Sequence, residues 1–361
     1  MGILGKLRTF TQYVFATANV IVVLAMCVTA YAGHVNTASV PFCEVLSLAF
    51  PIPVVVNLLF LLFWLLASPK FAFIPLAGFL VCWSPLRSYC PFNIPKEAPE
   101  GSIKVLCYNV CNFVGPGGPK ENLPKCTDYI QEVNADIVCL QETGASKRAL
   151  KGKADKRLER VYPYFDSLKK KGGERVSIYS RYPIRWTKEV PYESETNTST
   201  VHCLDVDGDS LLVFNCHLQT VGLSPVEKGE LKDFVDRKSN TLDEKPFVEK
   251  ITQNAKLRAR QVRLIVATLK KHSGASVLLC GDFNSSPVSY PHHLVSTVLD
   301  DCYRATGNGT SFTYSRGGIY ERIDNIFCSS DWKPYNCHVD TKNSISDHYP
   351  VICWIKKRSK P

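Results

Sequence analysis

Carboxylate, amide and imidazole side chains, which can bind cations and transfer protons, stand at the ends of short apolar runs after residue 100. In chain order they are Asn109, Glu142, Asn215 with His217, Asp282 with Asn284, Asp324, and Asp347 with His348. Taken alone, each has an ordinary structural explanation, because Asn and Asp are common turn residues. Six such placements in one chain are harder to explain as turns, since loops at strand ends usually display catalytic groups. The pattern therefore predicts one catalytic site.

Short strands are the elements that would position these side chains. The expected strands are Ile103–Tyr108, Ile137–Leu140, Val176–Tyr179, Val201–Leu204, Leu211–Asn215, Val277–Cys280, Ile323–Phe327 and Val351–Ile355. Several are almost continuously apolar, which is typical of strands covered on both faces. Apolar residues at helical spacing occur before Asn134 and over residues 255–269. Strands with helices between them predict packed sheets covered by helices, in an α+β or α/β layered sandwich.

The order and spacing of these motifs resemble those of the endonuclease/exonuclease/phosphatase superfamily over about residues 103–355. The motifs are Tyr108-Asn109-Val110, residues 136–142 (DIVCLQE), residues 180–184 (SRYPI), Asn215-Cys216-His217-Leu218, Gly281-Asp282-Phe283-Asn284, Arg322-Ile323-Asp324 and Ser346-Asp347-His348. Membrane-anchored bacterial members look most similar, including in the residues 287–290 (PVSY) after the GDFN motif. The resemblance implies an α/β fold, a four-layer sandwich of two packed mixed sheets flanked by helices, and hydrolysis of phosphoester bonds with a divalent cation.

The resemblance also implies roles that agree with the chemistry of the side chains. Glu142 offers the hard oxygen ligand that Mg²⁺ or Mn²⁺ prefers, with Asn109 and Asp347 as supporting metal residues. Asp282 is the expected general base for the attacking water. The amide of Asn284 is expected to fix the water or the phosphate.

Two histidines are expected to contact the reacting phosphate. His348, oriented by Asp324, would donate a hydrogen bond to the charge that develops on the phosphoryl group. His217 would be a second contact to the phosphoryl group or to the leaving group. Without the resemblance, Asp324 would be interpreted as one half of a buried ion pair at a strand end.

The first 100 residues differ in character from the rest of the chain. They hold five Lys/Arg and three Asp/Glu, against 38 and 30 in residues 101–361, and the net charge of the whole chain is +10. Three apolar stretches follow one another here, Thr11–Ala32, Val45–Ala67 and Phe71–Trp83. The first two reach the length of about 20 residues that a bilayer-crossing helix needs. The third is shorter and contains Pro75, so it either crosses a thin bilayer or dips in and returns. Residues 1–90 are therefore expected to form two to three transmembrane helices.

The distribution of Lys and Arg predicts the orientation of these helices. Lys6 and Arg8 place the N-terminus in the cytoplasm, the loop Gly33–Glu44 contains no Lys or Arg and suits the outside, and Lys70 suits the inside. A third crossing then places the remaining chain on the extracytoplasmic side, whereas a failed third crossing leaves it in the cytoplasm. The first stretch could instead be a signal peptide, which would leave this topology unchanged.

The remaining chain divides into a linker and a catalytic domain. Residues 91–102, with three prolines, predict a stiff linker, and residues 103–357 predict the catalytic domain. The fifteen cysteines are interpreted as buried thiols, and the lack of a Cys-x-x-Cys pair speaks against a structural zinc site.

The sequence thus predicts a multi-pass membrane protein whose anchored domain hydrolyses phosphoesters with Mg²⁺, or with Mn²⁺. The sequence does not distinguish between a lipid headgroup, a nucleic acid and a small phosphate ester as the substrate. Membrane lipid is an expected partner, and no obligate protein partner is expected. The alternative enzyme is a membrane-tethered endonuclease or exonuclease. An inactive anchored domain that binds a partner is a different class, against which the presence of Asp282 and His348 argues.

Overall fold

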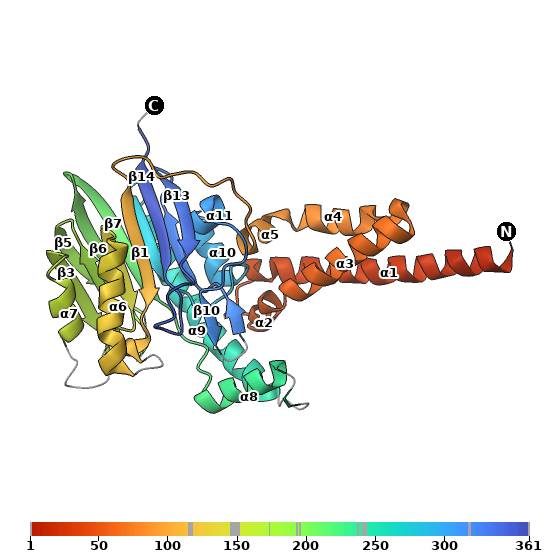
Figure 1. Cartoon of the computed structure of the whole chain (residues 1–361), viewed down its shortest axis with the longest axis horizontal. Helices are drawn as coiled ribbons and strands as arrows, with labels where there is room; N and C mark the ends of the chain where they lie inside the picture. Colours follow the sequence, from red (N-terminus) through yellow and green to blue (C-terminus); the bar gives the residue numbers. More distant parts are fainter. Residues whose placement is uncertain are drawn as a thin grey trace.

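Two six-stranded mixed sheets lie face to face in the chain after residue 102 (Figure 1). The first has the order β13 (Trp332–Val339), β14 (Val351–Lys357), β1 (Ile103–Asn109), β2 (Ile137–Gln141), β4 (Arg175–Ser180) and β3 (Tyr164–Lys169). The second has the order β5 (Ile184–Glu189), β6 (Ser199–Val206), β7 (Asp209–His217), β8 (Ser276–Asp282), β12 (Asp324–Cys328) and β9 (Asp300–Asp301). The computed structural model describes residues 2–114, 118–144, 152–172, 174–192, 194, 196–236, 238–239, 244–316 and 319–359.

Helices cover the outer faces of both sheets. α6 (Pro119–Val133) and α7 (Lys153–Leu158) pack on the first sheet, and α9 (Glu244–Lys271) and α10 (Tyr290–Ser296) pack on the second. The remaining elements are η3 (Cys111–Phe113), α8 (Pro225–Val235), α11 (Cys302–Thr306) and a hairpin of β10 (Tyr314–Arg316) and β11 (Ile319–Glu321). This arrangement confirms the predicted four-layer α/β sandwich.

Alternate residues of the central strands face two different cores. In β1, Val105 and Cys107 pack between the two sheets, while Leu106 and Tyr108 pack beneath α6. Because both faces of such a strand are covered, almost every position is apolar, which is the pattern that the sequence shows. All fifteen cysteines are free thiols, and most of them are buried, as expected.

The strands that the sequence did not indicate lie mainly at the sheet edges. β3, β5 and β13 are partly exposed along their length, so their residues lack the continuous apolar character of β1 or β8. The predicted helix before Asn134 is α6, and Asn134 ends it in the left-handed conformation with φ of 54°. The predicted apolar stripe of residues 255–269 belongs to α9.

An elongated bundle of apolar helices projects from the sandwich (Figure 1). It contains α1 (Ile3–Tyr31), η1 (Ala32–His34), α2 (Phe42–Leu48), α3 (Pro51–Ala67), η2 (Pro69–Phe71), α4 (Phe73–Val81) and α5 (Trp83–Tyr89). Among the described residues, one continuous helical segment, Ile3–His34, is long and apolar enough to cross a membrane. Two further pairs of helices are each broken by a bend: α2 with α3 by 42°, and η2–α4 with α5 by 65°. The number of possible membrane spans rises to three if each pair counts as one span.

A buried polar cluster joins the three long helices of this bundle. The Asn19 side chain donates to Asn57 Oδ1 (3.0 Å) and accepts from Trp64 Nε1 (3.1 Å), and Asn57 Nδ2 donates to the carbonyl of Pro75 (3.0 Å). The side chains of Asn19, Asn57 and Trp64 are fully buried. Polar groups that are satisfied between helices in this way hold apolar helices together in one arrangement.

The bundle is docked on the sandwich through a buried ion pair. Glu44 of α2 accepts hydrogen bonds from Arg258 Nη2 of α9 (3.0 Å) and from Ser285 Oγ (2.7 Å), and all three residues are 1% exposed. The backbone at Gly33 lies so close to Val288 that an added Cβ would stand 2.2 Å from the Val288 carbonyl oxygen. The contacts at Ser285 and Val288 lie directly after the GDFN motif.

Candidate active site

The ends of β1, β2, β7 and β8 and the start of β12 bring the predicted residues to one edge of the sandwich. In the parallel pair β7–β8, His217 lies opposite Asp282, and in the antiparallel pair β8–β12, Asp282 lies opposite Asp324. Asn109 ends β1 in register with Gln141, the residue before Glu142. The Ser346 hydroxyl donates to the Asn109 carbonyl (2.8 Å) and thereby holds the loop that carries His348 against this edge.

Backbone geometry at two motifs explains why these residue types are needed. Gly281 precedes Asp282 where β8 approaches β7 closely, and a Cβ at Gly281 would stand 2.0 Å from the Cys216 carbonyl oxygen. Only glycine therefore allows His217 and Asp282 to lie side by side. Glu142 and Asn284 adopt left-handed backbone conformations, with φ of 56° and 50°. Such strained positions in non-glycine residues cluster at functional sites.

One group in the site contains Asp282, Asp324 and His348, all of them buried. His348 Nδ1 lies 2.8 Å from Asp324 Oδ2, and His348 Nε2 lies 3.8 Å from Asp282 Oδ2. Burial disfavours the charged imidazole, but the charges of Asp324 and Asp282 outweigh it and raise the pKa of His348 above its usual value. Burial and the neighbouring Asp324 raise the pKa of Asp282 to about 6, against the opposing effect of His348 and His217.

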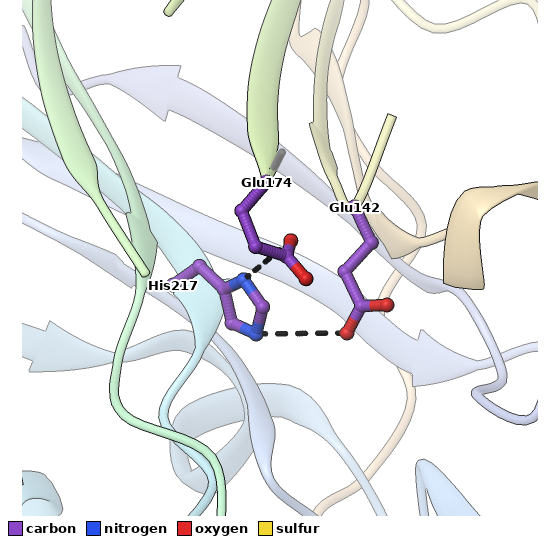
Figure 2. A group of neighbouring side chains, drawn as sticks. All are labelled: Glu142, Glu174 and His217. Atoms are coloured by element: carbon purple, nitrogen blue, oxygen red, sulfur yellow. Dashed lines mark ion pairs between the residues drawn. The ribbon is translucent and has the colours of Figure 1, made fainter. Parts of the chain in front are cut away.

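A second group contains Glu142, Glu174 and His217, whose side chains point toward one another (Figure 2). His217 Nε2 lies 3.7 Å from Glu142 Oε1 and 3.8 Å from Asp282 Oδ2, while Nδ1 lies 3.8 Å from Glu174 Oε2. His217 is 2% exposed, and neither ring nitrogen has a hydrogen-bond partner in the described part of the chain. Burial lowers the pKa of His217, whereas burial and the charges of Glu142 and Asp282 raise that of Glu174 to about 8.

Asn109 connects the two groups. Its Nδ2 donates to Glu142 Oε1 (3.0 Å) and to Asp282 Oδ2 (3.1 Å), while its Oδ1 accepts the backbone N–H of Cys111 (3.0 Å). In this arrangement Asn109 orients two carboxylates through its amide nitrogen, and its role beside a metal ion stays a prediction. Asp347 is half-buried beside Ser346, whose hydroxyl lies 3.3 Å from Asp347 Oδ1, and its charge contributes to the raised pKa of His348.

Two asparagines of the predicted motifs hold the backbone of the site. The Asn284 N–H donates to Asp282 Oδ1 (2.7 Å), and Asn284 Nδ2 donates to the carbonyl of Leu218 (3.0 Å). Asn284 thus fixes the general-base candidate and the loop after His217. Asn215 is fully buried and donates to the carbonyls of Leu140 and Ser177, so it supports the strands that carry the site.

Glu174 is the residue that sequence reasoning missed. It directly precedes β4, in a polar segment between Lys171 and Arg175 that matches no motif considered above. The only available signal was a carboxylate just before a buried strand. Most other site residues follow or end their strands, whereas Glu174 stands at the beginning of its strand. The antiparallel pairing of β4 with β2 brings the start of β4 to the end of β2, and hence Glu174 to Glu142.

The donor atoms of the site fit a divalent cation. Glu142 and Glu174 can each offer one carboxylate oxygen and His217 one ring nitrogen, and these three atoms lie within 4.8 Å of one another. Mg²⁺ prefers oxygen ligands and is commonly held by one or two carboxylates plus water and substrate phosphate. The group of Asp282, Asp324 and His348 could also hold a cation by its geometry, but His348 Nδ1 and Asp324 Oδ2 already contact each other at 2.8 Å.

Comparison with known proteins agrees with this fold. The endonuclease/exonuclease/phosphatase family matches residues 106–348, and residues 12–89 match a domain of unknown function (DUF8431). The solved structure of an endonuclease/exonuclease/phosphatase from Bacteroides vulgatus is 16% identical, with 72% of this chain and 100% of that chain covered and a TM-score of 0.51. Truncated TDP2 from Caenorhabditis elegans is 17% identical, with coverages of 71% and 97% and a TM-score of 0.50. No match is found among curated proteins.

The chain therefore belongs to the endonuclease/exonuclease/phosphatase family, whose members are hydrolases that act on phosphoester bonds. The family match covers every residue of the two side-chain groups described above.

Proposed function

We propose that this protein is a membrane-anchored phosphoester hydrolase of the bacterial type that uses a divalent cation, Mg²⁺ or Mn²⁺. The observation that carries the proposal is the placement of Asp282. This buried carboxylate lies 3.8 Å from both His217 and His348 and accepts a hydrogen bond from Asn109. Attack of water on a phosphate requires a group that removes a proton and hydrogen-bond donors to the negative charge that develops. A carboxylate flanked by two imidazoles can supply both.

Each residue then has a separate task. Asp282 accepts the proton of the attacking water, and the hydrogen bonds from Asn109 and Asn284 hold its two oxygens in place. His348, kept protonated and oriented by Asp324, donates from Nε2 to a phosphoryl oxygen. His217 presents Nε2 to the same space, and Glu174 beside Nδ1 orients the ring.

Glu142 would hold the cation, with Asn109 and Asp347 as the supporting metal residues, and Asn109 also fixes the Glu142 carboxylate. When bound there, the cation supplies Lewis-acid polarisation of the phosphoryl oxygen and the leaving group. An inactive anchored binding domain is the less favoured reading, because it would not require the complete set of Asp282, Asp324 and His348. A membrane-tethered nuclease remains the second enzyme class, and phosphoester substrates at the bilayer surface are favoured by the anchoring.

We propose three membrane spans, with residues 1–90 as the membrane region and residues 103–357 as the catalytic domain. In the bundle, α1 runs toward the sandwich, α3 runs away from it and α4 returns (Figure 1). Lys6 and Arg8 near the N-terminus and Lys70 between α3 and α4 therefore lie at the end remote from the sandwich. Cationic residues at one end favour the cytoplasm there, which supports an extracytoplasmic catalytic domain.

Reporter fusions expressed in a bacterium test this topology. An alkaline phosphatase that folds only outside the cytoplasm is expected to be active when fused after Ser102 and inactive when fused after Lys70. Fusion after His34 serves as a second positive position, because it follows the first span. Activity after Lys70, or a lack of it after Ser102, would contradict the three-span arrangement.

The metal proposal predicts the behaviour of Glu142→Gln, which keeps the size of the side chain and removes the charge. Turnover of bis(p-nitrophenyl) phosphate or p-nitrophenyl phosphate by the full chain in detergent is expected to fall at least tenfold, with partial rescue by raised Mg²⁺ or Mn²⁺. The exposed Glu132→Gln on α6 is the matched control. Circular dichroism should show an intact fold in both variants. Full turnover in EDTA would rule out the role of the cation.

Which substrate the site accepts is tested by assaying the same protein with a lipid phosphodiester, plasmid DNA and soluble phosphate monoesters. The full chain is the proper sample, because Glu44 of the helical bundle pairs with buried Arg258 of the sandwich. A sandwich without the bundle would leave that guanidinium without its carboxylate.

A further inference from the structure

A cavity of about 220 Å³ lies between the helical bundle and the sandwich, apart from the catalytic residues. Tyr31 at the end of α1, His34 of η1 and Ser88 of α5 contribute from the bundle, and His293 of α10 and Arg304 of α11 contribute from the sandwich. None of the residues assigned above to catalysis or to metal binding lines it. We call it the junction pocket.

The lining of the junction pocket is basic and rich in hydroxyl groups, and it includes no Asp or Glu. Arg304 Nη2 of the sandwich donates to Ser84 Oγ of the bundle (3.1 Å), which places the guanidinium at the boundary between the bundle and the sandwich. The rings of His34 and His293 lie 3.8 Å apart between their centroids. His292, also in the lining, is already paired with Asp301 (3.0 Å) behind the wall. The lining therefore offers hydrogen-bond donors and positive charge to a ligand.

Burial and the neighbouring imidazoles of His34 and His292 lower the pKa of His293. Burial is the largest of these causes, so His293 offers hydrogen bonds as a neutral imidazole and Arg304 supplies the positive charge of the lining. A bound anion would accept hydrogen bonds from both groups, as phosphate does in an arginine-containing pocket.

The position of the junction pocket suggests where such an anion comes from. Leu80, Val81 and Trp83 are exposed on the bundle directly before Ser84, and Leu24 and Val28 are exposed on α1 before Tyr31. The pocket thus lies at the level where the exposed apolar surface of α1 and α4 ends. Trp and Tyr side chains are enriched at this level in membrane proteins, next to the lipid phosphates.

We propose that the junction pocket binds the phosphate group of a phosphate ester, which a phospholipid headgroup or a soluble phosphate would supply. A water molecule in the liquid occupies about 30 Å³, so the cavity has room for a phosphate group and the first atoms of the alcohol that is esterified to it. Arg304 makes the charged contact, and the rings of His34 and His293 offer further hydrogen bonds. This site is independent of the proposed catalytic activity and would link the bundle to the sandwich through the bound phosphate group.

Calorimetric titration of the full chain tests the proposal, with EDTA present and in a phosphate-free maltoside detergent. Inorganic phosphate and a short-chain phosphatidylglycerol are the two probes. At least one is expected to bind, and Arg304→Gln should weaken that binding by roughly 10- to 100-fold, because a hydrogen bond to a charged group contributes about 1.5–3 kcal/mol. Arg304→Lys, which keeps the charge, should restore part of the affinity, and His293→Gln should weaken it by removing a ring donor.

Two control variants locate the binding. His348→Gln removes a donor from the catalytic site, and Arg185→Gln removes a partly exposed arginine on β5. Both should bind the probe as the unmodified chain does. Binding of the lipid alone identifies the headgroup as the source, and binding of both probes identifies the phosphate group itself. Absence of binding, equal binding by Arg304→Gln and the unmodified chain, or loss of binding in His348→Gln would each overturn the proposal.

Discussion

Replacement of Asp282 by Asn is expected to lower kcat about 10²-fold or more, which corresponds to about 2.7 kcal/mol of transition-state stabilisation. The variant loses the proton acceptor but keeps one amide oxygen, which can still accept the hydrogen bond of either Asn109 or Asn284, although not of both. Substrate and cation should therefore still bind. The measurement is kcat and KM of the full chain with bis(p-nitrophenyl) phosphate, beside thermal unfolding of the same sample.

His348→Ala is expected to cost a similar factor, because it removes a donor to the developing charge. Asp324→Asn should have a milder effect of the same kind, since it only weakens the hold on the imidazole. The double variant of Asp282 and His348 should lose less than the product of the single losses, because both residues serve one transition state.

A matched control separates catalysis from folding. His202 of β6 is as buried as His348 and is hydrogen-bonded to Thr187 and Thr200 (2.8 Å each), away from the site. His202→Ala should lower the unfolding temperature while the folded fraction keeps its kcat. If folded Asp282→Asn protein retained full specific activity, Asp282 would be a turn residue and the mechanism would be wrong.

Replacement of Glu44 by Leu is expected to destabilise the full chain by about 3–5 kcal/mol, because it leaves the buried guanidinium of Arg258 without its carboxylate. At roughly 2–4 °C per kcal/mol for a chain of this size, the unfolding temperature in detergent should fall by roughly 6–20 °C. Removing both charges in Glu44→Leu/Arg258→Met should recover much of the loss, since a well-packed apolar pair is often no worse than a buried ion pair.

The same ion pair is also expected to affect turnover. Arg258 Nη1 donates to the carbonyl of Gln219 (3.0 Å), two residues after His217, and Glu44 accepts from Ser285, one residue after Asn284. Loss of Glu44 should therefore loosen both loops and reduce kcat in the fraction that remains folded. The control is Asp205→Asn, which breaks the more exposed Arg185–Asp205 pair and should cost at most about 1 kcal/mol. A Glu44→Leu protein as stable as this control would show that the docking is weak.

The pairing of Glu44 with Arg258 also illustrates what a sequence cannot reveal. Glu44 was the one acidic residue within a long apolar region, and the charge pattern suggested only that it marks a loop between two spans. Its partner lies 214 positions away on α9. Charge alone does not identify that partner, because 43 Lys and Arg residues are available in the chain. Only the packing of the bundle on the sandwich selects Arg258.

The sequence by itself determined the eight inner strands of the two sheets and the residues that follow them. The apolar runs of β1, β2, β7 and β8 require burial on both faces, and this predicts a layered sandwich with Asn109, Glu142, His217 and Asp282 at its edge. Such local patterns can be recognised because the burial of a strand determines which of its own residues are apolar. Tertiary structure decided that Glu174 joins His217, that the amide of Asn109 faces two carboxylates, and that the bundle contacts the loop after Asn284. These contacts depend on strand pairing and on docking between segments that are distant in the chain. They therefore cannot be inferred from any short stretch of sequence.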